Sequence, residues 1–140
     1  NSDEIWHAGD IGSLDVYDKL TKLSNVKAVY GNIDSHKIRI ELKSELFFKC
    51  EGINIYMTHI GGYPGKYSKG IKEKIEKTNP NIFICGHSHI LKIMNDKKNK
   101  LLFLNPGAAG NHGVHKVKTI IKFDIDDKKI RNLKIIELKR

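Results

Sequence analysis

Residues 82–89 read Ile-Phe-Ile-Cys-Gly-His-Ser-His, an apolar run that ends in a glycine and two spaced histidines. The apolar part has the length of a buried β-strand. A His-x-His pair directly after a strand is a known arrangement for binding a metal ion through imidazole nitrogens. Taken alone, the segment is equally consistent with a polar strand end, so its meaning depends on what the rest of the chain places beside it.

Three other apolar runs end in the same way, with a small residue or threonine before a side chain able to bind a metal. They are Ala8-Gly9-Asp10, Tyr30-Gly31-Asn32 and Met57-Thr58-His59. Ligands of α/β sheets bind outside the carboxyl ends of the strands, so parallel strands would bring all four ends to one rim. Gly-Asp and Gly-Asn are also common turn formers, and His59 alone could cap a strand. Coincidence is a poor explanation for all of these residues together, in this order.

The spacing of apolar residues predicts an α/β fold. A helix is expected over 14–23, capped by Ser13, and another over 66–77, ended by Pro80. Residues 38–50 are expected to be extended, and 61–65 to form a loop. The β-helix-β order of the first part implies parallel strands, and the strand-rich end implies hairpins. The strands are expected at 4–9, 26–30, 53–57, 82–85, 90–95, 101–105, 117–125 and 130–138.

Composition favours a single soluble domain. The chain has 140 residues, 39% of them hydrophobic, and no apolar run near the roughly 20 residues that span a membrane. Its formal charge of +9 comes from 25 basic residues, of which only Arg39, Arg131 and Arg140 are arginines. Scattered lysines indicate a solvated surface. Nucleic-acid binding stays as an alternative, and it predicts a steep salt dependence.

The candidate ligands combine oxygen and nitrogen donors. Such a set suits manganese, iron, zinc or similar cations. Cys50 and Cys85 lack metal-type spacing, which argues against a thiolate zinc site and suggests two thiols in a reducing cytoplasm. Asp10 has two oxygens and could bridge two cations roughly 3.5–4 Å apart. The five candidates are Asp10, Asn32, His59, His87 and His89.

These motifs resemble the calcineurin-like metallophosphoesterases. The segments Gly31-Asn32-Ile33-Asp34 and Asn105-Pro106-Gly107 are similar to the compact bacterial and archaeal phosphodiesterase branch of that family. The resemblance implies a four-layer αββα sandwich of two mixed sheets flanked by helices. It also implies metal-dependent hydrolysis of phosphoesters, most of all phosphodiesters, by a hydroxide bridging two divalent cations.

The resemblance assigns roles to particular residues. Asp10, bridging both cations, would act in catalysis with Asn32 and His59. Asn32, His59 and His87 would complete one metal shell, and His89 would bind the other cation. Manganese is expected, with zinc, iron, nickel and magnesium as alternatives. His112 and Gly61 would contact a small phosphoester substrate. A homodimer is an open expectation, and no membrane partner is expected.

The chain departs from the family pattern in two places. No Asp-x-His precedes Asp10, so residues 1–140 are expected to be a single domain lacking its first strand, with on the order of 20–25 residues ahead of them in the full protein. Ile33 stands where larger members place a histidine, which leaves the general acid unassigned. His7, His36, His112 and His115 are candidates by residue type.

Two alternatives share the fold. A catalytically impaired protein-binding scaffold, as in the related retromer subunit, would work through protein contacts. A phosphomonoesterase would use the same metals with different pocket walls.

Overall fold

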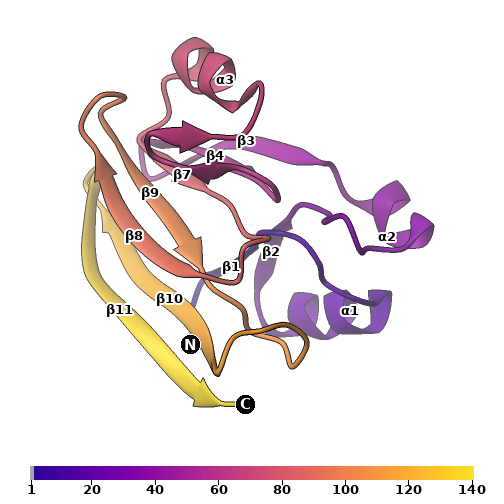
Figure 1. The fold of residues 1–140 in the computed structure, drawn as a ribbon. Helices are drawn as coiled ribbons and strands as arrows, with labels where there is room; N and C mark the ends of the chain where they lie inside the picture. Colours follow the sequence, from indigo (N-terminus) through magenta and orange to yellow (C-terminus); the bar gives the residue numbers. More distant parts are fainter. Residues whose placement is uncertain (1) are drawn as a thin grey trace.

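The computed structural model describes residues 2–140 and confirms the predicted α/β class (Figure 1). The larger sheet has five strands in the order β3-β4-β7-β9-β8. Strands β4, β7 and β9 are parallel, and the two edge strands are antiparallel to their neighbours. The strands are β3 (Glu45–Cys50), β4 (Ile53–Thr58), β7 (Ile82–Ile84), β8 (Leu91–Asp96) and β9 (Leu101–Pro106).

A second strand layer consists of two separate pairs. Strand β1 (Glu4–His7) pairs in parallel with β2 (Asn25–Ala28), and β10 (Val117–Asp126) forms an antiparallel hairpin with β11 (Lys129–Lys139). Trp6 of β1 contacts Phe48 of β3 and Phe123 of β10, edge to face, at centroid distances of 5.1 and 5.6 Å. The main core therefore lies between the two strand layers.

Helices cover the outer faces of these layers. Helix α1 (Leu14–Leu23) has the predicted bounds, and the Ser13 side chain accepts a hydrogen bond from the Val16 N–H. With α2 (His36–Glu41), it packs on β2 around Ile11, Ala28 and Ile38. Helix α3 (Ile71–Thr78) buries Ile71 and Ile75 against the far face of the five-stranded sheet. None of the helices in residues 2–140 is long and apolar enough to cross a membrane.

Three segment predictions were wrong. Residues 61–65 are not a loop throughout, because Gly62–Tyr63 form a short strand. Residues 38–50 are not extended throughout, because residues 36–41 form α2. Ile38, Ile40 and Leu42 alternate as in a strand, but a helix turns Ile38 and Leu42 to the same core cluster and leaves Ile40 68% exposed.

The predicted helix over 66–77 also begins too early. Residues 66–67 form β6 (Lys66–Tyr67), paired with β5 (Gly62–Tyr63), and α3 starts only after Gly70. Tyr67 lies outside the helix, and its hydroxyl donates a hydrogen bond to Asp96. This long-range contact has no local sequence signal.

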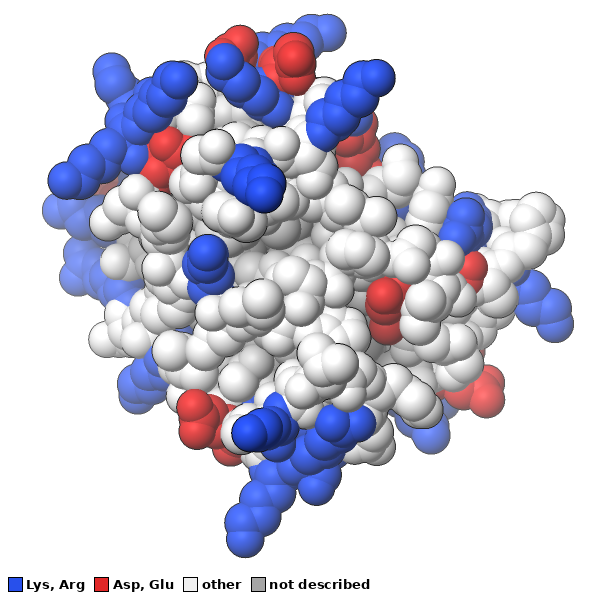
Figure 2. All heavy atoms as spheres, viewed as in Figure 1, with Lys and Arg blue, Asp and Glu red and all other residues white. Residues whose placement is uncertain are grey.

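Charged side chains are spread widely over the surface. Figure 2 shows Lys and Arg side chains mainly around the edge of the visible face, with Asp and Glu side chains among them, and a mostly uncharged centre. This distribution agrees with lysines that are exposed to solvent over the surface of the fold.

We predict that Phe83→Ala destabilises the fold by about 3–5 kcal/mol, because a buried aromatic side chain leaves a cavity when truncated. Phe83 is fully buried and its ring contacts those of Tyr56, Tyr67 and Phe103. Urea unfolding followed by circular dichroism measures the loss. Phe47→Ala is the matched control, since Phe47 is 46% exposed. Equal losses in the two variants would contradict the assigned core.

Candidate metal centre

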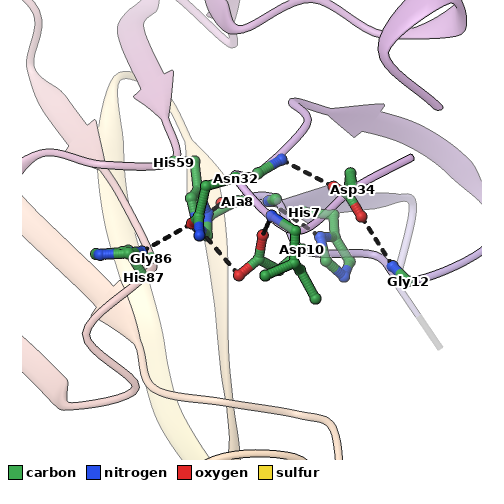
Figure 3. Close-up of polar contacts among 12 residues, drawn as sticks. His7, Ala8, Asp10, Gly12, Asn32, Asp34, His59, Gly86 and His87 are labelled. Atoms are coloured by element: carbon green, nitrogen blue, oxygen red, sulfur yellow. Dashed lines mark hydrogen bonds and ion pairs between the residues drawn. The ribbon is translucent and has the colours of Figure 1, made fainter. Parts of the chain in front are cut away.

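Four loops at the ends of two parallel strand pairs form the candidate site. Asp10 and Asn32 lie beyond β1 and β2, and His59 and His87 lie beyond β4 and β7. The pairs belong to different sheets, so the four ends are not neighbours in one sheet as the sequence suggested. They meet because both strand pairs end at the same side of the core, and Figure 3 shows the side chains of Asp10, Asn32, His59 and His87 close together.

The four side chains converge on one point. His59 Nε2 lies 3.2 Å from Asp10 Oδ2 and 3.0 Å from Asn32 Oδ1. His87 Nδ1 also lies 3.0 Å from Asn32 Oδ1. Asp10, His59 and His87 each present a ligand atom, and these atoms lie within 4.8 Å of one another. Among the predicted residues, the structure thus brings together Asp10, Asn32, His59 and His87.

The hydrogen bonds of His59 define which of its nitrogens is free. Its Nδ1 lies 2.7 Å from the backbone oxygen of Ala8, which can only accept, so Nδ1 carries the proton. In the neutral ring Nε2 then has a lone pair, and it faces the oxygens of Asp10 and Asn32. A divalent cation placed between these three atoms would bind the Nε2 lone pair and both oxygens.

The spacing of the donors fits a metal ion. Neighbouring ligands of an octahedral cation with bonds of about 2.1 Å lie roughly 3.0 Å apart. The donor pairs in the site are 3.0 to 3.2 Å apart. Oxygen and imidazole donors suit manganese, iron or zinc. Thiolate is not part of this set, because no cysteine belongs to the converging group within the described residues. Burial raises the pKa of the Cys85 thiol to about 12.

The backbone around the ligands adopts conformations that non-glycine residues usually avoid. Asp10, His87 and His89 have φ angles of 56°, 66° and 57°. Such left-handed residues are uncommon and gather at functional sites. Gly31, directly before Asn32, is required for another reason: a Cβ at this position would lie 1.9 Å from Asp10 Oδ1. The small residues before the ligands therefore allow the loops to approach each other.

Asp34 and Arg39 hold the loop that carries Asn32. The buried Asp34 carboxylate accepts hydrogen bonds from the N–H groups of Gly12 and Gly31 at 2.9 and 2.8 Å. Arg39 donates to the backbone oxygens of Asp34 and Asn32. Neither residue was predicted to have a role at the site, although Gly31-Asn32-Ile33-Asp34 contains the signal of an Asp side chain that closes a turn.

Asn105 has a matching role in the loop after β7. Its buried amide donates to the Gly86 backbone oxygen at 2.9 Å and to Ser88 Oγ at 3.1 Å. These bonds fix the loop between the two histidines of the His-x-His pair. The sequence indicated Asn105 only as part of a family motif.

His89 lies outside the converging group within the described residues. Its ring packs edge to face on that of His115, with centroids 5.4 Å apart. His115 Nε2 donates to the Gly110 backbone oxygen at 2.9 Å, and its Nδ1 is the one buried side-chain nitrogen or oxygen without a partner in residues 2–140. The structure therefore places a second imidazole pair on the loops that follow β7 and β9.

The other predicted residues differ in their surroundings. Gly61 is buried in the loop after β4, and His112 is exposed in the loop before β10. His7 accepts a hydrogen bond from the Gly9 N–H, and burial lowers its pKa, although the nearby Asp34 and Asp10 charges oppose this shift. His7 therefore supports the turn that presents Asp10.

Comparisons with known proteins agree with this site. Residues 1–128 match the model of the calcineurin-like phosphoesterase superfamily domain. A probable metallophosphoesterase of Methanothermobacter thermautotrophicus is 29% identical over 106 residues, which are 74% of this chain and 59% of that protein. The chain thus spans less than two thirds of the length of this curated relative.

Solved structures share the fold. An archaeal phosphodiesterase superposes with a TM-score of 0.75 at 23% identity, covering 99% of this chain and 84% of that one. A Zn²⁺ complex of Vps29 from Entamoeba histolytica superposes with a TM-score of 0.73 at 20% identity, covering 97% and 81%. The family model covers most of the chain, and the fold and the converging donors accord with it. The chain belongs to the calcineurin-like phosphoesterase superfamily.

Proposed function

We propose that this protein hydrolyses phosphoesters, most of all phosphodiesters, with the help of two divalent cations, manganese being the expected metal. The observation that carries the proposal is the convergence of the Asp10, Asn32 and His87 side chains near Nε2 of His59. Membership in a phosphoesterase family supports the reaction type. The structural likeness to an archaeal phosphodiesterase is compatible with the diester preference.

Asp10, Asn32, His59 and His87 would hold the first cation. We assign Asp10 and His89 to the second cation, on the resemblance of the Gly-His-Ser-His motif to the family pattern. Cations held by these residues would activate a water for attack on the phosphorus and neutralise charge on the phosphoryl oxygens.

The surrounding residues keep the ligands in position. The Ala8 carbonyl keeps the proton of His59 on Nδ1, so that Nε2 faces the metal position. The Ile33 N–H donates to Asp10 Oδ1 at 3.1 Å, which orients the carboxylate while its other oxygen points to His59. Positioning of this kind lowers the cost of arranging ligands and substrate in the reaction.

The metal content tests the two-cation proposal directly. We expect two manganese ions per chain by elemental analysis after exchange into manganese buffer. A single ion per chain would support the four-donor site alone and contradict the second cation. Absence of bound metal would overturn the whole proposal.

Replacing Asp10 tests whether the site is catalytic. We expect Asp10→Ala to lower manganese affinity and the hydrolysis of bis(p-nitrophenyl) phosphate by at least about 100-fold, because substitutions beside metal ligands already cost 10–100-fold. Isothermal titration calorimetry and a colorimetric assay measure the two effects. Asp18→Ala, on the exposed side of α1, is the control.

The scaffold alternative makes the opposite prediction. A protein that works only through partner contacts would show no metal-dependent hydrolysis in the wild type, and Asp10→Ala would leave partner binding intact. Unchanged hydrolysis in the Asp10→Ala variant would rule out this site as the catalytic centre.

Asp34→Asn tests the support of the Asn32 loop. The Gly12 and Gly31 N–H groups bond to different oxygens of Asp34, and an amide puts an NH₂ group in place of one of these oxygens, so one of the two bonds is lost. We expect manganese affinity to fall by about 10–100-fold while the fold persists. Calorimetry and circular dichroism measure these two properties. Asp124→Asn in the exposed β10–β11 hairpin is the control, and an equal loss there would contradict the role of Asp34.

A further inference from the structure

A pocket of about 230 Å³ lies between the loop after β4 and the loop after β7. Its walls include the β5–β6 hairpin through Tyr63 and the β8 residue Lys92, with Phe103 among the residues beneath. A larger hollow of about 380 Å³ near Phe47 and Pro80 shares no residue with the metal centre, so it is not a candidate for the substrate.

The pocket adjoins the metal centre through a shared residue. His87 lines the pocket and also contacts Asn32 in the metal centre. Ile60, another wall residue, directly follows His59. A phosphoryl group held by the cluster would therefore have one of its ester substituents next to this pocket.

Apolar side chains that are exposed to solvent line the pocket. Ile60, Tyr63 and Ile90 are 45%, 41% and 62% exposed. Single exposed apolar residues are common, but three around one small hollow are typical of a surface that a ligand covers. Pockets for drug-sized ligands measure about 300–1,000 Å³, so this one suits a single ring-sized group.

The pocket also contains one positive charge. The Lys92 ammonium lies over the Tyr63 ring, 4.2 Å from its centroid. This cation–π contact holds the charge at the wall, where it can attract an anionic phosphoryl oxygen. The wall itself rests on the core: a Cβ on Gly61 would lie 2.7 Å from the Cys85 Cβ and from the Phe83 ring. The β4 loop is therefore fixed in place before a ligand arrives.

We propose that this pocket binds an aromatic or similarly apolar, ring-sized ester group, so that the preferred substrates are phosphoesters carrying such a group next to the phosphorus. This inference rests on the proposed function, because the phosphoryl group must sit at the metal centre. It goes further by naming the class of organic group that the protein recognises.

Phenylphosphonate and methylphosphonate separate the pocket proposal from the proposed function of the metal centre. Both present the same phosphonate to the metal centre, and only the first carries a ring. By isothermal titration calorimetry with manganese-loaded protein, we expect phenylphosphonate to bind roughly tenfold more tightly, as burial of one ring's apolar surface allows. Ile90→Ser and Tyr63→Ala should reduce this ratio towards one without changing manganese binding.

A matched control separates the pocket from a general loss of apolar surface. Ile40→Ser removes another exposed isoleucine, on α2, and should keep the tenfold ratio. Equal binding of the two phosphonates by the wild type would overturn the pocket proposal and leave the proposed function standing. An unchanged ratio in Ile90→Ser and Tyr63→Ala would place the ring elsewhere. Failure of both phosphonates to bind would count against the metal-centre function as well.

Discussion

The hydrogen bond from His59 Nδ1 to the backbone oxygen of Ala8 joins the two strand layers at the metal centre. His59 comes from the end of β4 in the five-stranded sheet, and Ala8 directly follows β1 in the other layer. The bond is buried, so an unpaired nitrogen or oxygen at either end would be costly. It therefore links the two layers at the site and holds a proton on Nδ1 of His59.

The remaining features of the site follow from this close approach of the two layers. The Gly86 N–H donates to the His59 backbone oxygen at 2.9 Å, which draws the loop after β7 towards the loop after β4. In the other layer, Gly31 has no side chain, which leaves room for the Asp10 carboxylate. The left-handed backbone at Asp10 and His87 turns their side chains inward at a local conformational cost. That cost is tolerated because the hydrogen bonds made by Asn105 and Asp34 hold the flanking loops in place.

The position of the pocket links chemistry with recognition. The metal centre lies where the two layers meet, and the pocket beside it is lined by Tyr63 of β5 and by Lys92 and Phe103 of the five-stranded sheet. His87 and Ile60 connect the two regions, so the same loops carry ligands on one side and apolar walls on the other. Because the same loops carry both, the substrate that binds depends on the geometry of the metal ligands.

Local pattern alone determined most strand positions along the chain, helix α1 with its Ser13 cap, and the four loop ends that carry candidate ligands. These features depend on residues near one another in the chain, where alternation, capping and glycine punctuation have direct physical causes. The tertiary structure decided the helical state of 36–41 and the late start of α3, because burial of Ile38 and the Tyr67–Asp96 bond involve distant partners. It also decided that two different sheets supply the ligands, that Asp34 and Asn105 hold their loops, and that His89 pairs with His115. Contacts between residues far apart in the sequence leave no local periodicity, so only the folded chain reveals them.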